Sequence, residues 1–338
     1  MSSFTVLITG TYLVPEAQQR LHDVGAQLVF MNEPIDEDAL VSALSASPVD
    51  VMLLRGPKPV TRRVLDAAPD LKLIAKNGAG VDSVDLLETE RRGICVAVAP
   101  GANAHAVAEH TLAAMLALVR DLSGHDHRVR GGAWEGSTYQ GRDFAGSVVG
   151  IIGFGHIGQI TARMAEALGA HVVVFDPSGQ ACAHAVETDL DALLARIDIL
   201  SLHCPLTDQT RGMIGARQLQ SMKPGAFIVN TARGGLIDEH ALAAALLDGH
   251  LGGAALDTLA VEPLDPASPL RQVPNIIFTP HIAGVTRQAA QQVASITAQN
   301  VVDYMQGRTL PARHIVCPGR ALTGVPASTH AATQGSLP

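Results

Sequence analysis

The stretch Gly153-Phe154-Gly155-His156-Ile157-Gly158 is a GxGxxG fingerprint, and it decides how the middle of this chain folds. The apolar run at 147–152 predicts a buried strand before it, and residues 159–168 predict a helix after it. A second apolar run at 171–176 predicts the next strand, which brings Asp176 to its carboxyl end. This order of strand, glycine turn, helix and strand is typical of a dinucleotide-binding fold.

The residue types of the fingerprint indicate a bound pyrophosphate. Glycines allow a tight turn and a close approach of the main chain to a pyrophosphate at a helix N-terminus. Asp176 is expected to accept hydrogen bonds from the adenosine ribose, and its charge would repel a 2′-phosphate, so we expect NAD rather than NADP. The alternative is an ordinary βαβ turn. The candidate cofactor contacts in this part are Gly153, Gly155, His156, Ile157, Gly158 and Asp176.

Length and composition restrict the possible classes of protein. The chain has 338 residues, of which 47% are hydrophobic, so two domains with ample cores are expected. A net charge of −8 without a basic block argues against nucleic acid or an anionic membrane as a partner. The chain enters a strand at once, so no signal peptide is expected, and residues 102–119 indicate a packing helix interrupted by polar side chains. The 4 cysteines lack CxxC spacing, which favours a reducing cytoplasm.

Strand and helix patterns alternate along most of the chain. The first part predicts an α/β unit of its own, with strands at 5–9, 27–31, 51–54, 71–75 and 94–98 and helices at 15–24, 36–44 and 61–67. The centre predicts further strands at 197–202, 226–230, 253–256 and 276–279, followed by a long helix at 286–305. Residues 318–338 are rich in Pro, Gly, Ser, Thr and Ala and predict a flexible tail.

Four further motifs stand in a fixed order. They are Gly78-Ala79-Gly80-Val81-Asp82, Asn-Thr-Ala-Arg-Gly-Gly-Leu-Ile-Asp at 230–238, Asp-Thr-Leu-Ala-Val-Glu-Pro at 257–263, and Thr-Pro-His-Ile-Ala-Gly at 279–284. With these motifs the chain resembles the D-isomer-specific 2-hydroxyacid dehydrogenase family, which includes phosphoglycerate, glyoxylate/hydroxypyruvate and D-lactate dehydrogenases. The resemblance covers residues 4–317.

This resemblance implies an α/β fold of two doubly wound parallel-sheet domains, with a Rossmann NAD domain inserted into a flavodoxin-like substrate domain. The substrate domain is expected at residues 1–101 and 285–317, the NAD domain at 102–284, and the active site in the cleft between them. In relatives the helix that begins near residues 106–110 and the loop after it, here with Trp134, pair two subunits. A homodimer is therefore implied.

The expected chemistry is the reduction of a 2-keto acid, which needs a hydride, a proton and a cation that holds the carboxylate. Arg233 suits the last task because its guanidinium is a planar fork that keeps its charge. His281 is the natural general acid, and the resemblance makes Glu262 the carboxylate that favours its protonated form. In the oxidative direction His281 would act as base, which predicts opposite pH trends for the two directions. The alternatives are a structural salt bridge for Arg233 and simple packing for His281.

Small residues at 78–80 would bring backbone N–H groups close to the substrate carboxylate, although a plain turn is the alternative. The family often has Arg-Ser where this chain has Arg55-Gly56-Pro57-Lys58, so whether Arg55 or Lys58 holds a phosphate stays open. The candidate substrate contacts are Arg55, Asn77, Gly78, Ala79, Gly80, Arg233 and His281.

The loop at 203–210 resembles the family's loop beside the cofactor, and Asp257 resembles the carboxylate near the nicotinamide carboxamide. Cys204 is expected to pack or to make a backbone contact, because no base that would activate it is apparent. The remaining candidate cofactor contacts are His203, Cys204, Pro205, Thr210, Thr231, Ala232, Arg233, Asp257, His281 and Gly284.

Several features leave the substrate and some alternatives open. Thr258-Leu259 stands where the family commonly has Val-Phe, and Ser83 where it has Asn. With 3% aromatic residues, a small polar 2-keto acid is expected rather than an aryl substrate. No metal site is expected, because His125-Asp126-His127 stands alone in a charged stretch that predicts a solvated turn.

Three other functions are alternatives to the reduction of a 2-keto acid. A formate dehydrogenase is disfavoured because that group usually carries Gln at the position of Glu262. A phosphite-type dehydrogenase has overlapping catalytic residues and stays an alternative. An NAD-sensing, corepressor-like binding protein is the other, although the residues left over are expected to form no regulatory domain.

Overall fold

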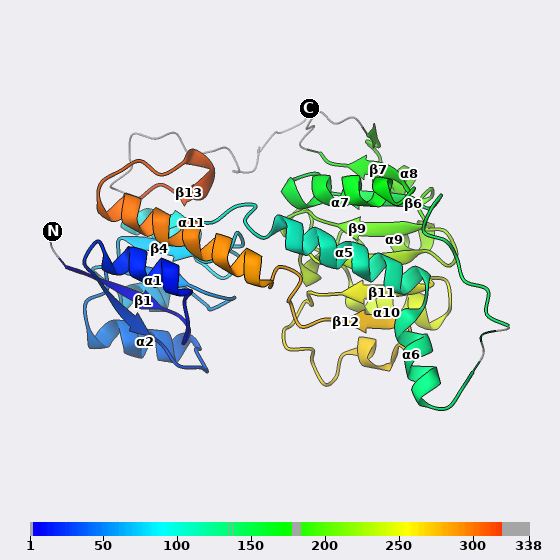
Figure 1. The fold of residues 1–338 in the computed structure, drawn as a ribbon, viewed down its shortest axis with the longest axis horizontal. Coiled ribbons are helices and arrows are strands. Elements are labelled where there is room, and N and C mark those ends of the chain that lie inside the picture. The colour runs from blue at the N-terminus through cyan, green and yellow to red at the C-terminus, as the bar shows by residue number, and fades with distance from the viewer. Residues whose placement is uncertain (1–2, 135, 137, 178–183, 320–338) are drawn as a thin grey trace. The chain divides into compact units, whose positions relative to one another are not determined.

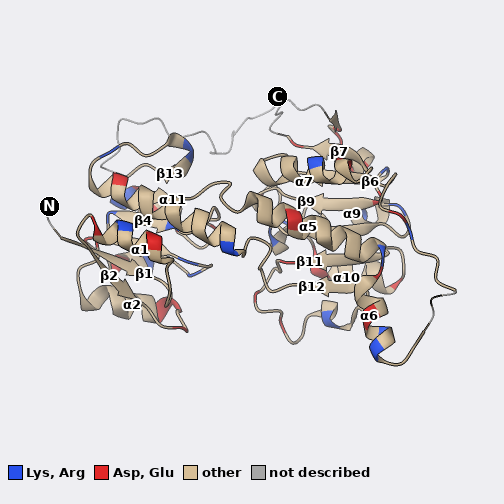
Figure 2. Cartoon of the chain, viewed as in Figure 1, with Lys and Arg blue, Asp and Glu red and all other residues tan. Residues whose placement is uncertain are grey.

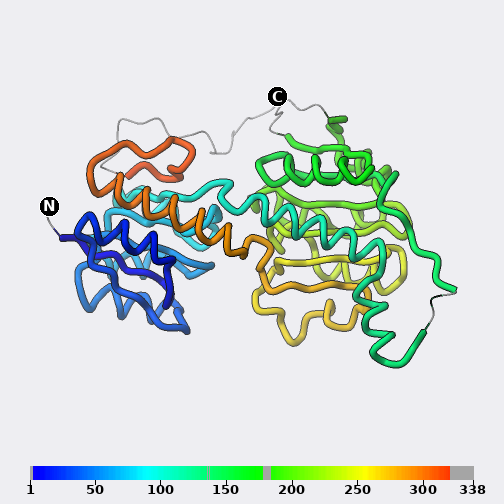
Figure 3. Tube along the Cα trace, viewed as in Figure 1, coloured from blue at the N-terminus to red at the C-terminus, as the bar shows by residue number. Residues whose placement is uncertain are grey.

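The chain folds into two compact units. The computed structural model describes residues 3–134, 136, 138–177 and 184–319. Of the described residues, those up to 103 and from 286 onward form unit 1, and those between 104 and 285 form unit 2. The expected borders after residues 101 and 284 differ from these by two residues or fewer. Figure 3 follows the chain from unit 1 into α5 (Ala104–Val119) and from unit 2 back into unit 1 at α11 (Arg287–Met305).

Unit 1 is built on a parallel sheet with an antiparallel edge strand. Within the described residues the strand order is β13-β5-β4-β3-β1-β2, and β13 pairs with β5 in the antiparallel sense. The order 2-1-3-4-5 of the parallel strands is flavodoxin-like. The strands are β1 (Phe4–Ile8), β2 (Ala26–Phe30), β3 (Val51–Leu54), β4 (Leu73–Lys76), β5 (Cys95–Ala97) and β13 (Ile315–Cys317).

Helices bury both faces of this sheet. Figure 1 shows α1 (Pro15–His22) beside α11, and their apolar side chains share a core with alternate residues of β1 and β3. The opposite set of strand residues packs with α2 (Glu37–Ala46), α3 (Arg62–Asp66) and α4 (Leu86–Arg92). Each of these three helices begins after an N-cap whose side chain accepts a backbone N–H, which fixes its start. The caps are Asp36, Thr61 and Asp85.

Unit 2 is built on a second, doubly wound parallel sheet. Within the described residues the order is β12-β11-β10-β9-β6-β7-β8, which reverses direction between β6 and β9. In such sheets ligands bind at the carboxyl ends of the strands, beside the reversal. The strands are β6 (Val148–Ile152), β7 (His171–Phe175), β8 (Ala185–Val186), β9 (Ile199–Leu202), β10 (Phe227–Asn230), β11 (Gly253–Leu256) and β12 (Ile276–Phe278). The predicted fold class is therefore confirmed.

Helices also cover the sheet of unit 2. Figure 1 shows α5 and α7 (His156–Ala167) side by side over the sheet. Glu109 is the only Asp, Glu, Lys or Arg residue in α5, which is otherwise tan in Figure 2. No helix in the described part of the chain has the length and apolar character needed to cross a membrane. The other helices are α8 (Leu190–Leu194), α9 (Ala216–Ser221), α10 (Glu239–Leu247) and the 3₁₀ turns η1 (Gly234–Leu236), η2 (Pro269–Gln272) and, in unit 1, η3 (Ala312–His314).

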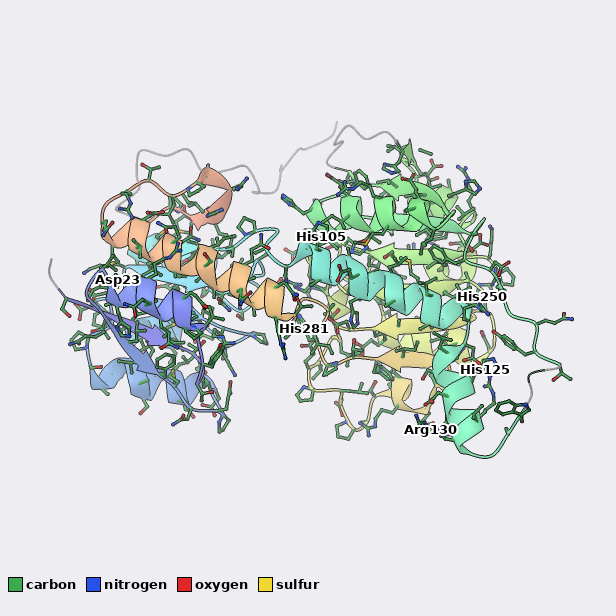
Figure 4. The ribbon with its side chains drawn as sticks, in the orientation of Figure 1. Asp23, His105, His125, Arg130, His250 and His281 are labelled. Atoms are coloured by element: carbon green, nitrogen blue, oxygen red, sulfur yellow. The ribbon has the colours of Figure 1, made fainter. Side chains whose placement is uncertain are left out.

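Two predictions of local structure are wrong. The helix after the fingerprint begins at His156, inside the motif, and not at residue 159. The stretch His125-Asp126-His127, predicted as a turn, lies in α6 (Leu122–Arg130), on which Figure 4 labels His125 and Arg130. The Arg130 and Asp126 side chains pair at 2.8 Å one turn apart. Among the described residues no group of three His, Cys, Asp or Glu is arranged to hold a metal ion. Cys182 and most of the predicted tail, 320–338, lie outside the described residues.

Candidate active site

The three glycines of the fingerprint serve different purposes in the turn between β6 and α7. A Cβ on Gly153, whose φ is +90°, would lie 2.6 Å from the backbone nitrogen of Cys204, and a Cβ on Gly158 would lie 2.2 Å from the Gly153 carbonyl oxygen. Both glycines therefore keep backbone segments in direct contact. A Cβ on Gly155 would meet no protein atom within 4 Å.

The open space at Gly155 lies at the N-terminus of α7. Gly155 is the N-cap of this helix and supplies no side-chain cap. The first N–H groups of a helix have no partner within the helix, and their dipoles favour an anion. A pyrophosphate fits this place because it needs those donors and the space that a Cβ would fill.

Asp176 directly follows β7 and braces the glycine turn. Its Oδ2 atom accepts a hydrogen bond from the Phe154 N–H at 2.6 Å. A carboxylate has about four acceptor positions, so one bond to the turn is compatible with further bonds to ribose hydroxyls. Asp176 therefore fits the predicted contact and also supports the turn itself.

The loop after β9 closes on itself beside the glycine turn. The Thr210 hydroxyl donates to the Pro205 carbonyl oxygen at 2.7 Å and accepts the Thr207 N–H at 2.8 Å. The imidazole of His203 lies with its Nε2 2.8 Å from the Ser201 hydroxyl, and burial lowers the pKa of His203 to about 4. This histidine is therefore neutral at neutral pH.

Cys204 packs in the same loop. Its Sγ lies 4.0 Å from the Met213 sulfur, and burial raises the pKa of the Cys204 thiol to about 11. The thiol stays protonated near neutral pH, and the thiolate is the reactive form. Its environment is thus that of a packing residue, as the sequence predicts.

Several hydrogen bonds fix the turn that carries Arg233 at the end of β10. Asn230 is buried; its amide Nδ2 donates to the Arg233 carbonyl oxygen at 2.9 Å, and its Oδ1 accepts the Ala232 N–H at 3.0 Å. The Thr231 hydroxyl lies 2.8 Å from that of Thr111 on α5. The Arg233 guanidinium donates to the Ala232 carbonyl oxygen at 2.7 Å. This turn stands at the carboxyl edge of the sheet.

His281 and Glu262 form a pair within unit 2. Nδ1 of His281 lies 2.8 Å from Oε2 of Glu262, and Oε1 of the same carboxylate accepts the Leu259 N–H at 3.1 Å. His281 lies on the loop between β12 and α11 (Figure 4) and has a φ of +56°, a region that residues other than glycine rarely adopt. Its N–H donates to the Asp257 carbonyl oxygen at 2.8 Å, which helps to hold this conformation.

The Arg233 turn and the Glu262 loop lie directly against each other. A Cβ on Gly234 would be 1.9 Å from the carbonyl carbon of Leu259, so no side chain fits there. Glu239, in the first turn of α10, accepts the Ala260 N–H at 2.7 Å through Oε1. Glu239 was not predicted as part of the site, since an acidic residue in a first helical turn is common for its effect on the helix dipole.

Asp257 is buried under the His281 turn. Its Oδ1 accepts the Thr279 hydroxyl at 2.5 Å and the Ile282 N–H at 2.8 Å, and its Oδ2 accepts the Ala283 N–H at 2.9 Å. A contact with a nicotinamide carboxamide would have to use its remaining acceptor capacity. Gly284, the last of the predicted cofactor contacts, follows this turn.

The predicted substrate residues of unit 1 lie at the carboxyl ends of β3 and β4. The backbone N–H of Arg55 donates to the Thr9 hydroxyl at 2.8 Å, and the Arg55 guanidinium donates to the Tyr12 carbonyl oxygen. Arg55 and Thr9 follow β3 and β1, the two strands between which the strand order reverses. Lys58 forms an ion pair with Glu33 at 2.8 Å, so its charge is compensated.

The turn after β4 uses some of its own donors. The Asn77 N–H donates to the Leu54 carbonyl oxygen and the Gly78 N–H to that of Lys76, both at 2.9 Å. The Lys76 amine donates to the Gly56 carbonyl oxygen and thereby ties this turn to the Arg55 loop. Of the three N–H groups expected to face the substrate, that of Gly78 is therefore already engaged, and those of Ala79 and Gly80 fit the role better.

Comparison with known proteins places these features in a family. Residues 112–283 match the NAD binding domain of the D-isomer specific 2-hydroxyacid dehydrogenases. D-3-phosphoglycerate dehydrogenase of Mycobacterium tuberculosis (strain ATCC 25618 / H37Rv) is 38% identical over 313 residues, which cover 91% of this chain and 58% of that protein. Hydroxypyruvate reductase of Thermotoga maritima is 37% identical over 272 residues, which cover 79% of this chain and 88% of that protein. The crystal structure of the TT0316 protein from Thermus thermophilus has a TM-score of 0.85 and 34% identity, with 93% of this chain and 100% of that chain covered.

The matches differ in how much of each relative they cover. The chain spans about half the length of the D-3-phosphoglycerate dehydrogenases that it matches, from 48% to 58%. The match of unit 2 to an NAD binding domain confirms the predicted cofactor. The chain belongs to the D-isomer specific 2-hydroxyacid dehydrogenase family.

Proposed function

We propose that this chain is an NAD-dependent D-2-hydroxyacid dehydrogenase that transfers hydride between NADH and the carbonyl carbon of a small 2-keto acid. The observation that carries the proposal is the 2.8 Å pair of His281 Nδ1 and Glu262 Oε2 in the unit that also contains the glycine turn. An imidazole held by a carboxylate at Nδ1 keeps Nε2 for proton exchange with a substrate.

Each of the three catalytic residues has a distinct task in this mechanism. When bound, NADH supplies the hydride that adds to the carbonyl carbon. His281, oriented by Glu262 through Nδ1, donates its Nε2 proton to the carbonyl oxygen as negative charge develops there. Arg233 orients the carboxylate and carbonyl oxygens with its guanidinium fork. In the oxidative direction His281 Nε2 accepts the hydroxyl proton.

The remaining site residues hold the ligands. The N-terminus of α7 and the space at Gly155 would hold the pyrophosphate, and Asp176 the ribose. Substrate binding is assigned to unit 1, where Arg55 and the N–H groups of Ala79 and Gly80 would meet the carboxylate. Lys58 is paired with Glu33 in this structure, and the substrate panel below tests whether a phosphorylated 2-keto acid is accepted.

We also propose that the chain forms a homodimer in the cytoplasm. Trp134 is 85% exposed and Leu122 is 58% exposed in the single chain, on α6 and the loop after it, which suits a surface that a second subunit covers. The free thiols of Cys95, Cys204 and Cys317 suit a reducing compartment. Light scattering after size exclusion tests the dimer, and Trp134→Ser should shift the molar mass towards that of one chain.

The test of the activity is NADH oxidation against a panel of 2-keto acids, with NADPH in parallel. The panel contains glyoxylate, hydroxypyruvate, pyruvate, 2-ketobutyrate, phenylpyruvate and 3-phosphohydroxypyruvate. We expect turnover of one or two small members with NADH and much less with NADPH, and loss of this turnover in His281→Asn. If no member reacts while NADH still binds, the proposal fails, and phosphite oxidation or NAD sensing becomes the better explanation.

A further inference from the structure

A partly buried polar network joins helix α5 to the turn that carries His281. Nε2 of His110, on α5, lies 3.1 Å from the Thr279 hydroxyl oxygen, and that hydroxyl lies 2.5 Å from Oδ1 of Asp257. His110 Nε2 is 3.9 Å from the same carboxylate oxygen, which is too far for a direct hydrogen bond. Thr279 therefore relays the contact between His110 and Asp257.

The hydrogens of this network can be assigned by counting donors. An ionised carboxylate only accepts, so the single Thr279 proton points to Asp257. The Thr279 oxygen can then only accept from His110, so the proton of a neutral His110 sits on Nε2. Every hydrogen bond of the network thus points towards Asp257.

Asp257 also accepts hydrogen bonds from the backbone around His281. Its carboxylate accepts the N–H groups of Ile282 and Ala283, and its own carbonyl oxygen accepts the His281 N–H. His281 has a φ of +56°, an unfavourable conformation that persists only where its surroundings hold it. The carboxylate and carbonyl of one residue therefore hold the turn that aims the imidazole.

The network is shielded most at Asp257, whereas the His110 side chain is 27% exposed. Asp257 is 3% exposed, and the cavity lined by His110, Thr231, Asp257 and Thr279 has a volume of about 10 Å³. This is close to the space that one water molecule needs. Hydrogen bonds in such an environment are stronger than in bulk water, and an unmade one is costly.

We propose that His110 and Thr279 are positioning residues, which act through Asp257 to hold the His281 imidazole in its working orientation. The inference rests on the dehydrogenase function proposed above. It concerns only how the general acid is held, since neither residue takes part in the proton transfer itself.

Matched variants separate the hydrogen bonds from the packing. Thr279→Val removes the hydroxyl at nearly constant volume, and Thr279→Ser keeps it. His110→Leu removes the donor, and His110→Gln keeps an N–H group. Thr161→Val is the control, because Thr161 is buried on α7 and its hydroxyl has no hydrogen-bond partner among the residues described.

The first measurement needs no activity. Hydrogen–deuterium exchange of the free protein reports on the amides of Ile282 and Ala283, which Asp257 holds. We expect these amides to exchange at least about tenfold faster in Thr279→Val and His110→Leu, because opening of the turn becomes easier. Thr279→Ser, His110→Gln and Thr161→Val should exchange like the wild type.

The second measurement is the kinetics with the best 2-keto acid. A small misplacement of a catalytic group costs up to about 100-fold, so kcat should fall about 10- to 100-fold in Thr279→Val, while KM for NADH changes little. Thr279→Ser should restore kcat. Unchanged kcat in Thr279→Val would overturn the inference, whether or not the exchange changes. If the wild type reduces no 2-keto acid, the proposed function fails, and unchanged exchange in Thr279→Val would then overturn the network as well.

Discussion

Glu262 binds His281 and its own loop with the same carboxylate, since Oε2 lies 2.8 Å from the imidazole Nδ1 and Oε1 accepts the Leu259 N–H at 3.1 Å. The two side chains are 31% and 46% exposed. Exposed ion pairs add little to folding stability. Loss of this pair is therefore expected to lower turnover rather than the unfolding free energy.

Replacing either member should lower turnover without unfolding the protein. His281→Asn removes the proton donor and should lower kcat in both directions about 100- to 10,000-fold. Glu262→Gln keeps a hydrogen bond to the ring but removes the charge, so a smaller loss is expected. Steady-state kinetics checks both, and urea unfolding should change by less than about 0.5 kcal/mol.

The pH dependence of wild-type turnover should differ between reduction and oxidation. Reduction needs a protonated His281 and should slow as pH rises, whereas oxidation needs the neutral ring and should slow as pH falls. His22→Asn, at the exposed end of α1, is the matched control and should retain both profiles. Near-wild-type turnover of His281→Asn in both directions would rule out its role as acid and base.

Alanine at Gly158 should lower stability, whereas alanine at Gly155 should lower NADH affinity. In Gly158→Ala the new methyl group would lie 2.2 Å from the Gly153 carbonyl oxygen, so the variant should lose about 1–3 kcal/mol of unfolding free energy. In Gly155→Ala the methyl group meets no protein atom within 4 Å, so unfolding should change by about 1 kcal/mol or less. NADH affinity should nevertheless fall at least about tenfold in Gly155→Ala, because the methyl group occupies the place assigned to the pyrophosphate.

Urea unfolding and a fluorescence titration with NADH measure the two effects separately. Equal NADH affinity of Gly155→Ala and the wild type would contradict the assignment of the pyrophosphate to this space. A fully stable Gly158→Ala would contradict the close packing of α7 on the turn.

Asp176 has two roles that its variants should separate. Asp176→Asn keeps an oxygen that can accept the Phe154 N–H but removes the charge, so it should raise kcat/KM for NADPH relative to NADH with little loss of stability. Asp176→Ala loses the hydrogen bond as well and should cost about 1 kcal/mol. Kinetics with both cofactors and urea unfolding provide the readouts. A wild type that prefers NADPH would contradict the assignment of Asp176 to the ribose.

The strands and long helices could be predicted because their signals are local. Residues 51–54 and 253–256 are short apolar runs, and the structure has β3 and β11 over the same residues. Helix α6 was missed because it buries none of its residues and so lacks an apolar period. Strand β13 was missed because it has three residues and pairs with a distant part of the chain.

The supporting contacts of the site could not be predicted, because they join distant positions. His110 and Thr279 are 169 residues apart, and Glu239 contacts the backbone of a residue 21 positions away. Local patterns contain no information on such pairs. The motifs did point to the functional loops, since a polar or glycine-rich segment directly after a buried strand lies at the ligand-binding edge of a parallel sheet.

Because of His203, the unfolding free energy is expected to fall in mild acid. Burial lowers its pKa to about 4 in the folded protein, whereas an unfolded histidine titrates near its ordinary value of about 6.5. Between these values the unfolded chain binds more protons than the folded one, so the unfolding free energy falls as pH falls. The full difference corresponds to about 3 kcal/mol, present above pH ~6.5 and lost by pH ~4.

Urea unfolding of the wild type and of His203→Gln at pH 7 and pH 4.5 measures this loss. Glutamine carries no charge at either pH, so the variant should lose about 2–3 kcal/mol less than the wild type over this range. Burial also lowers the pKa of His314, but this residue contributes equally to both proteins and cancels in the comparison. Equal losses in the two proteins would show that His203 takes up its proton without unfolding, and hence that the loop after β9 opens to solvent in the folded state.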